Sequence, residues 1–224
     1  MYIKKYLFDL YSEISTYQKS KRYFSIRTSV KEWNHLYEEG HWDYLEDYGE
    51  AARYDVIIGM IRRRKSIKTI LDLGCGSGVL AEHLENGKYA YTGIDFSAKA
   101  IEKSNPAYGS FHTADVTSYI PEHKYDCIVA NEVLYYISDQ IGLIQKYMDW
   151  LTEDGFIIIS LYLRKSPLKL IKKMTENVLT DISHLQNVEV LENVIVNNNL
   201  GWKRDWYVLL IRNKRSHNDG HVNQ

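Results

Sequence analysis

The stretch "ILDLGCGSGVL", residues 70–80, constrains this chain more than any other. It places Gly74, Gly76 and Gly78 at alternate positions directly after a short apolar run. Glycine adopts left-handed backbone conformations at no steric cost, and it lets a ligand lie against the main chain. We therefore expect a buried strand ending at Leu73, a tight turn, and a ligand in contact with the backbone of that turn.

The chain around this turn has the pattern of an α/β protein. From Ile67 onward, short β-branched runs alternate with helical stretches, which predicts right-handed crossovers and a parallel sheet with helices on both faces. The last two predicted strands, residues 188–196 and 206–212, are separated by too few residues for a crossover helix, so they should pair as an antiparallel hairpin. Upstream, residues 43–65 carry apolar side chains at helical spacing, which predicts an amphipathic helix.

Composition limits the classes of partner. The 224 residues are 45% hydrophobic with a formal net charge of -1, which suits one globular core and gives no overall attraction to nucleic acid. Cys75 and Cys127 lack metal-site or redox spacing, so we expect free thiols, no metal and a cytoplasmic protein. The sequence lacks an apolar run of the roughly 20 residues that a membrane span needs. We expect a monomer or homodimer that binds neither nucleic acid nor membrane.

Acidic residues at the ends of the next strands favour a nucleoside ligand. Asp95 ends the second predicted strand, where a carboxylate can accept hydrogen bonds from a ribose diol. Asp115 and the backbone of Val116 follow the third strand and could read an adenine edge. A dinucleotide fingerprint would place its third glycine at position 79, where this chain has Val79.

These motifs together resemble the class I S-adenosylmethionine-dependent methyltransferases. The similarity runs in order over residues 67 to about 163: an acid and three alternate glycines after the first strand, an acid after the second, A-D-V after the third, and D-x-I-V-x-N-E-V-L-Y-Y after the fourth. The resemblance implies a seven-stranded, mostly parallel Rossmann-like sheet with a C-terminal antiparallel hairpin and an N-terminal helical cap. It also implies S-adenosylmethionine as cofactor and S-adenosylhomocysteine as product.

The resemblance also implies roles for individual residues. The methionine end of the cofactor would contact Asp72, Gly74, Cys75, Gly76 and Gly78. The ribose and adenine would contact Asp95, Phe96, Asp115 and Val116, and the loop beside the sulfonium would begin at Asn131 and Glu132. Carboxylates near this crevice would repel a pyrophosphate and suit a ligand that carries ammonium and sulfonium charges.

The N-terminal region, residues 33–54, interleaves aromatic and acidic side chains. Two interpretations remain open: a helix that packs its aromatics on the domain, or a lid that closes over the cofactor and excludes water. In the second, Trp42 contacts the cofactor, Tyr37 takes part in catalysis and acceptor binding, and Arg53 pairs with the methionine carboxylate. The predicted organisation is a cap or lid over residues 1–66, a methyltransferase core over 67–215 and a flexible tail over 216–224.

Candidates for the acceptor pocket come from two other segments. His184, between the fifth strand and the final hairpin, is the candidate general base and acceptor ligand. Tyr135 follows the fourth strand and could line the pocket. Arg164 and Lys165 begin a basic run after the fifth strand, which is either a solvated helix face or a clamp for an anionic acceptor.

The predicted function is methyl transfer to a small polar metabolite, to an oxygen of a sugar or of a phosphate- or phosphonate-bearing precursor. N-methylation of a small amine or amino sugar is the alternative reaction. A nucleoside-binding scaffold without catalysis, and a nicotinamide-dependent oxidoreductase, are the alternatives from other classes. Asn131 and Glu132 lack the Asn/Asp-Pro-Pro-aromatic signature, which disfavours nucleic-acid bases and glutamine as acceptors.

Overall fold

The computed structural model describes residues 29–163, 169–199 and 204–215. Its described part contains one seven-stranded sheet with the order β3-β2-β1-β4-β5-β7-β6. Strands β1 to β5 are parallel, and β7 pairs antiparallel with both β5 and β6. The strands are β1 Thr69–Leu73, β2 Ala90–Asp95, β3 Ser110–Thr113, β4 Tyr125–Asn131, β5 Leu151–Tyr162, β6 Val188–Asn198 and β7 Arg204–Asn213.

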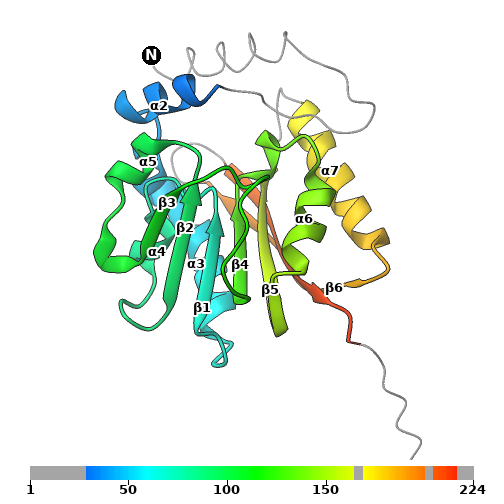
Figure 1. Ribbon diagram of the computed structural model, residues 1–224. Coiled ribbons are helices and arrows are strands. Elements are labelled where there is room, and N and C mark those ends of the chain that lie inside the picture. Colours follow the sequence, from blue (N-terminus) through cyan, green and yellow to red (C-terminus); the bar gives the residue numbers. More distant parts are fainter. Residues whose placement is uncertain (1–28, 164–168, 200–203, 216–224) are drawn as a thin grey trace, which may run out of the picture.

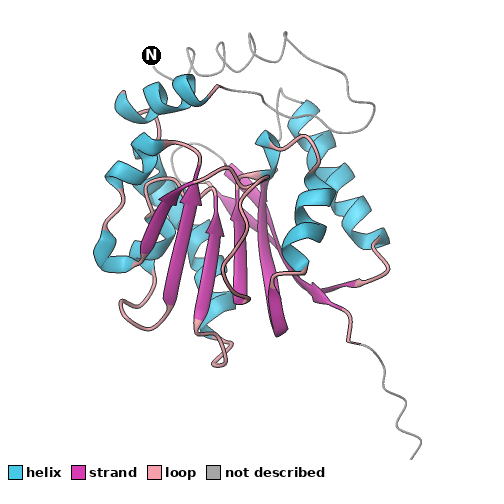
Figure 2. Ribbon diagram, viewed as in Figure 1, coloured by secondary structure: helices cyan, strands magenta, loops and turns pink. Residues whose placement is uncertain are grey.

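Helices lie on both faces of this sheet (Figures 1 and 2). The α-helices are α2 Val30–Glu38, α3 Tyr48–Arg62, α4 Val79–His83, α5 Ala98–Lys103, α6 Gln140–Met148 and α7 Lys169–His184. Three short 3-10 turns accompany them: η1 Asp43–Glu46, η2 Pro106–Tyr108 and η3 Leu134–Tyr136. The predicted fold, a mostly parallel sheet with a C-terminal antiparallel hairpin, is confirmed.

Strict alternation along the strands produces two cores. On β1, Ile70 packs with side chains of α3 and α4, whereas Leu71 packs with side chains of α6 and α7 on the opposite face. Each inner strand is buried on both faces, which explains why the strands read as continuous apolar runs. The strand order reverses between β1 and β4, so the ligand crevice of such a sheet is expected at the carboxyl ends of these two strands.

The N-terminal helices divide between core and cap. Helix α3 buries Tyr54, Ile57, Ile58 and Ile61, as the spacing predicts, but it buries them against the sheet. Helix α2 lies over the carboxyl ends of the parallel strands, beside α5 (Figure 1). Within the described residues, the predicted cap over 1–66 therefore reduces to α2 and η1, and the sheet's helical layer begins at Tyr48 rather than after residue 66.

Helix α2 starts where its sequence directs. Ser29 accepts a hydrogen bond from the Glu32 backbone N–H, and the Glu32 carboxylate accepts one from the Ser29 N–H, a reciprocal capping box. Within the described ranges, no helix is long and apolar enough to cross a membrane.

Candidate active site

The glycine turn after β1 has the conformation that its sequence predicts. Gly74, Gly76 and Gly78 have φ values of +70°, +59° and +86°, in the left-handed region. A Cβ on Gly76 would lie 2.8 Å from the Tyr37 hydroxyl oxygen, and one on Gly74 would lie 2.6 Å from Val133 Cγ2. The turn therefore requires glycine for both backbone conformation and space. Cys75, between two glycines, is buried, with its Sγ 2.8 Å from where a Cβ on Gly93 would lie.

Asp95 joins the end of β2 to this turn. Its Oδ2 accepts a hydrogen bond from the Gly76 N–H at 3.1 Å, and its Oδ1 accepts one from the Ser97 N–H at 2.8 Å. Burial raises the pKa of Asp95 to about 6, although the hydrogen bonds from Ser97 and Gly76 oppose that rise. Each carboxylate oxygen keeps a further lone pair, so a diol at this point could be bound without displacing either amide.

Asp72 lies inside β1, one residue before its end, and is buried. Its Oδ2 accepts a short 2.5 Å hydrogen bond from the Tyr91 hydroxyl. Its Oδ1 has no hydrogen-bond partner among the described residues. Burial raises the pKa of Asp72 to about 7. A buried oxygen without a donor is costly, so this atom marks a place where a ligand donor would be favourable.

The loop after β4 carries strain beside the same turn. Glu132 has φ +59°, the one described non-glycine residue with a positive φ. Its N–H donates to Ser160 Oγ at 3.1 Å, and the Ser160 hydroxyl lies 2.7 Å from Asn131 Oδ1 and 2.9 Å from Glu132 Oε1. A left-handed residue with a Cβ costs on the order of 1 kcal/mol and is typical of functional loops. Ser160 therefore fixes both residues predicted beside the sulfonium.

Aromatic side chains of α2 cover this end of the sheet. Trp33 packs against Phe96 with ring centroids 5.6 Å apart, and against Trp42 at 5.1 Å. Tyr37 is buried over the glycine turn, where burial and then the Asp95 charge raise the pKa of its phenol well above the ordinary value. Asn34 anchors α2 to the domain, because its Oδ1 accepts the Ser97 hydroxyl at 2.7 Å. The packing of these aromatic side chains on the domain is therefore observed, and closure of this region over a cofactor stays a prediction.

Arg53 is only 2% exposed and contacts protein carboxylates. Its Nη2 lies 3.0 Å from Glu50 Oε2, and its Nη1 lies 3.7 Å from Glu132 Oε2. Glu50, 3% exposed, also forms an ion pair with Arg204 at the start of β7. The expectation that Arg53 meets the methionine carboxylate is corrected to this extent: its positive charge is already balanced by Glu50 and Glu132. Its Nε still lacks a hydrogen-bond acceptor among the described residues.

The predicted adenine residues lie on the turn after β3. Asp115 is exposed, and its Oδ1 accepts hydrogen bonds from the Thr117 N–H at 2.8 Å and the Thr117 hydroxyl at 2.7 Å. Val116 is buried. The Ala114 N–H donates to the backbone carbonyl of Asp95 at 2.8 Å, which ties this turn to the end of β2 and so to the residue predicted to bind the ribose.

The predicted acceptor residues are not brought together. His184 is exposed at the C-terminal end of α7, and α7 runs back from the end of β5 toward the start of β6 (Figure 1). It therefore lies at the opposite end of the sheet from the glycine turn, and the structure does not support His184 as general base or acceptor ligand. Because β6 is parallel to β5, a helix that joins them starts at the carboxyl ends of the strands and finishes at their amino ends, where its last residue, His184, lies. Arg164 and Lys165 lie outside the described residues, as does the side chain of Tyr135.

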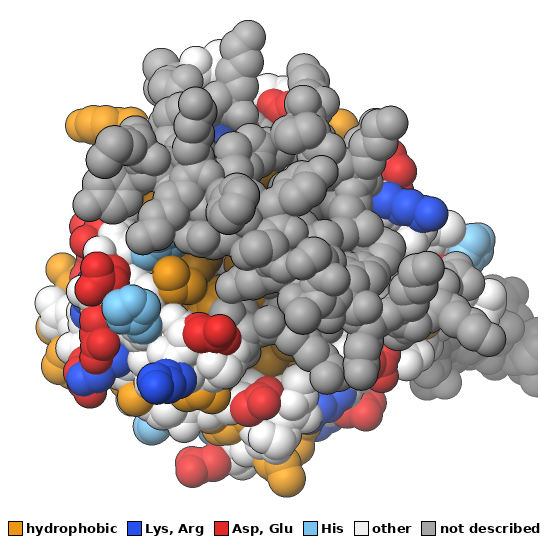
Figure 3. All heavy atoms as spheres, turned by 90° about the horizontal axis from the view of Figure 1, so that it is seen from above, with side chains coloured by type: hydrophobic (Ala, Val, Ile, Leu, Met, Phe, Trp, Pro, Cys, Tyr) orange, Lys and Arg blue, Asp and Glu red, His pale blue; other side chains and the backbone are white. Residues whose placement is uncertain are grey.

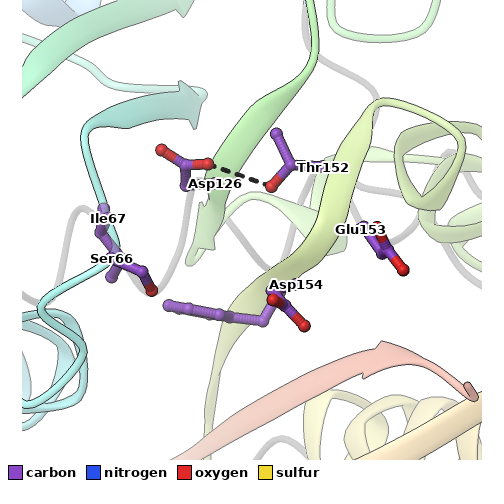
Figure 4. Close-up of a pocket in the computed structure, with 7 residues that line it drawn as sticks. Ser66, Ile67, Asp126, Thr152, Glu153 and Asp154 are labelled. Carbon is purple, nitrogen blue, oxygen red and sulfur yellow. Dashed lines mark hydrogen bonds between the residues drawn. The ribbon is translucent and has the colours of Figure 1, made fainter.

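A hollow of about 250 Å³ lies near the amino-terminal ends of β1, β4 and β5, away from the glycine turn (Figure 4). Asp126 on its wall accepts hydrogen bonds from the N–H groups of Lys68 and Thr69 and from the Thr152 hydroxyl at 3.0 Å. Partial burial alone would raise the pKa of Asp126, but these hydrogen bonds lower it overall. Asp126 therefore anchors β1 to β4 and β5, and the hollow is not our candidate for the chemistry. No group of three metal-ligating side chains occurs within the described ranges.

Comparison with known proteins agrees with this geometry. A family model described as a methyltransferase domain matches residues 3–221. The chain belongs to this family. The resemblance to class I S-adenosylmethionine-dependent methyltransferases is thereby confirmed.

Individual relatives are similar to this chain at low sequence identity. Malonyl-acyl-carrier-protein O-methyltransferase 2 of Ilyobacter polytropus is 26% identical over 174 residues, which are 73% of this chain and 66% of that protein. Nodulation protein S of Azorhizobium caulinodans is 27% identical over 124 residues, 52% of this chain and 60% of that protein. The chain thus spans less than two thirds of the length of either relative.

Solved structures share the fold. The N-methyltransferase NodS of Bradyrhizobium japonicum WM9, in complex with S-adenosyl-L-homocysteine, aligns with a TM-score of 0.65 and 19% identity over 78% of this chain and 92% of that one. Magnesium protoporphyrin IX methyltransferase of Synechocystis PCC 6803, with the same bound product, aligns with a TM-score of 0.61 and 14% identity over 80% and 98% of the two chains.

Sequence reasoning missed several residues of this site. Glu50 and Arg204 are about 150 positions apart and meet only in the folded chain, so no local pattern signals their ion pair. Ser160 lies inside an apolar strand, where a single hydroxyl could have indicated a buried hydrogen bond. Tyr91 aligns with Ile70 in the β1–β2 register, so it lies on the same face of the sheet as Asp72, two residues further along β1, and its hydroxyl can reach that carboxylate.

Proposed function

We propose that this methyltransferase uses S-adenosylmethionine to methylate a small polar metabolite. The observation that carries the proposal is the glycine turn with three left-handed residues, joined to Asp95 through the Gly76 amide. The three glycines carry no side chain, so a ligand can lie against the main chain there, and the buried Asp95 carboxylate lies at the end of the turn, as a nucleoside bound against the backbone requires.

A second feature that fits this cofactor is the buried carboxylate of Asp72. Asp72 Oδ1 is a buried acceptor without a donor among the described residues, and an ammonium group could supply one. The bound cofactor would supply an activated methyl group for an in-line displacement. The protein's part is then to hold the acceptor in line, which Ser160 assists by fixing Asn131 and Glu132, and to exclude water with the aromatic side chains of α2.

For the acceptor, we propose an oxygen of a sugar or of a phosphate- or phosphonate-bearing precursor. The relative from Ilyobacter polytropus is named as an O-methyltransferase, which supports transfer to oxygen. The structural neighbour NodS is named as an N-methyltransferase, so a small amine or amino sugar is the second candidate. Tyr37 stays a proposed contact for the reacting groups, because its hydroxyl is buried against the glycine turn.

We further propose that the protein works in the cytoplasm as a monomer or homodimer without a nucleic-acid partner. Acidic and basic side chains are interspersed over the described part of the face above the strand ends, which supports a small-molecule partner rather than a polyanion (Figure 3). Two buried free thiols, Cys75 and Cys127, suit a reducing compartment.

The experiment that tests the function is transfer of a labelled methyl group from S-adenosylmethionine to a panel of acceptors. The panel contains a neutral sugar, a sugar phosphate, a phosphonate, a primary amine and an amino sugar. Labelled sugar, phosphate ester or phosphonate ester supports O-methylation, whereas label on nitrogen supports the second candidate. Product binding without any transfer would favour the non-catalytic scaffold.

A further inference from the structure

Lys146 on α6 directs its ammonium group at the turn between β3 and β4. Its Nζ lies 2.7 Å from the Tyr119 carbonyl oxygen, 2.9 Å from that of Thr117 and 3.4 Å from that of Val116. An ammonium group has three donors, and here three carbonyls of one short turn surround it. The ammonium group of Lys146 therefore stabilises the conformation of this turn by binding its carbonyl oxygens, as a bound cation would.

A neighbouring side chain reinforces the same turn. The Tyr147 hydroxyl donates to the Val116 carbonyl at 2.8 Å. Within the turn, the Asp115 carbonyl accepts the N–H groups of Ser118 at 3.1 Å and Tyr119 at 2.8 Å. The two bonds to the Asp115 carbonyl polarise the peptide group between Asp115 and Val116, whose N–H donates no hydrogen bond to the described residues.

The charge environment of Lys146 differs from that of an ordinary surface lysine. No carboxylate of the described residues lies within ion-pair distance of Lys146, although its side chain is partly exposed. Burial lowers the pKa of Lys146, and the charge of Asp115 opposes that shift. A flexible lysine side chain usually keeps its ammonium group in water, which avoids the free-energy cost of desolvation. The ammonium group of Lys146 is instead fixed on three carbonyls, so it stabilises the conformation of that turn.

We propose that Lys146 is a positioning residue for recognition of the adenine base, which rests on the proposed function. By anchoring the carbonyls of residues 116–119, it sets the Asp115 carboxylate beside the Val116 N–H. This pair offers one acceptor and one donor side by side, which complements the 6-amino group and N1 of adenine. Lys146 touches no ligand atom itself and acts through the turn.

The test measures base discrimination rather than affinity alone. The dissociation constants of S-adenosylhomocysteine and S-inosylhomocysteine are determined by calorimetry for the wild type and for Lys146→Met. Inosine presents a carbonyl and an N1–H at the same edge, so a correctly set turn should reject it by about tenfold or more. In Lys146→Met, we expect this ratio to fall to about two- or threefold because the donor and acceptor are no longer held in register.

Controls separate positioning from general loss of structure. Lys88→Met removes an exposed lysine that pairs with Glu85, and it should leave the ratio unchanged. Tyr147→Phe should lower the ratio less than Lys146→Met does, and Lys146→Arg should restore part of it. If Lys146→Met does not fold, these two variants carry the test.

The outcomes are distinct. Equal weakening of both ligands, with the wild-type ratio kept, would overturn the role of Lys146 while leaving the proposed function intact. A wild type that does not bind S-adenosylhomocysteine would overturn the proposed function itself.

Discussion

The two sides of the crevice are built differently. On the side of β1 to β3, the surface consists of backbone: the left-handed turn of Gly74 to Gly78, with Asp95 bound to two amides. On the side of β4 to β7, long charged side chains from distant segments meet in one cluster. Its members are Glu50, Arg53, Glu132 and Arg204.

This difference indicates which side of the crevice can change its ligand specificity through substitutions. A backbone surface depends on a few adjacent residues and suits a ligand that never changes, such as a cofactor. A cluster of side chains depends on the mutual placement of α3, β7 and the loop after β4, so one substitution alters both charge and shape. We infer that the first side serves the cofactor and the second the acceptor.

The largest expected effect comes from breaking the charged cluster. Glu50→Gln leaves Arg53 and Arg204 without their shared buried carboxylate, and removing one partner of a buried pair costs about 3 to 5 kcal/mol. Urea denaturation should show this loss, whereas Glu85→Gln, which removes an exposed partner of Lys88, should be nearly neutral. Equal stability of the two variants would contradict a structural role for the cluster.

A smaller effect of opposite sign is expected at Asp72. Because its pKa is raised by burial from 3.8 to about 7, the native state keeps a proton that the unfolded state loses between about pH 4 and 7. The free energy of unfolding therefore falls as pH rises through that window. Asp72→Asn should raise the free energy of unfolding at pH 8 by on the order of 2 to 4 kcal/mol, with a gain that shrinks toward pH 4.

Asp126→Asn is the matched control, because the pKa of Asp126 is lowered and the sign reverses. That variant should lose stability at neutral pH. Asp72→Asn should also bind S-adenosylmethionine more weakly than the wild type despite its greater stability. A variant that is more stable and binds the cofactor equally well would show that Asp72 has no part in the site.

The smallest effect on stability is expected in the glycine turn. Gly76→Ala forces a Cβ into the left-handed region and within 2.8 Å of the Tyr37 hydroxyl, at a cost of about 1 to 2 kcal/mol. The cofactor surface should be disturbed as well, so affinity for S-adenosylhomocysteine should fall by about tenfold. Gly59→Ala, in α3 with nothing within 4 Å, should be neutral or stabilising. A Gly76→Ala protein with wild-type affinity would mean that the ligand does not lie on this turn.

The contrast between the two sides also explains what the sequence could predict. The glycine turn and the position of Asp95 at the end of β2 follow from local motifs, because a strand, its glycines and its terminal acid are adjacent in the chain. The final hairpin follows from a short connection. These features could all be found without knowing the packing.

The remaining features depend on three-dimensional placement. From its position between the fifth strand and the final hairpin, His184 is predicted to line the acceptor pocket, but α7 carries it to the other end of the sheet. Arg53 was expected to meet the ligand, whereas Glu50 lies one helical turn before it and neutralises it. Packing against distant segments decides which face of a helix contacts a given strand. No local motif in a single sequence shows that choice.

The measurement that tests the central claim most directly is calorimetric titration of S-adenosylhomocysteine into the wild type and Asp95→Ala, with a nicotinamide dinucleotide as the competing ligand. We expect micromolar binding of S-adenosylhomocysteine alone. The affinity of Asp95→Ala should be lower by tenfold or more, since each hydrogen bond to a charged carboxylate contributes about 1.5 to 3 kcal/mol. Equal affinity in the two proteins, or preference for the dinucleotide, would contradict the assignment of this crevice to the nucleoside of S-adenosylmethionine.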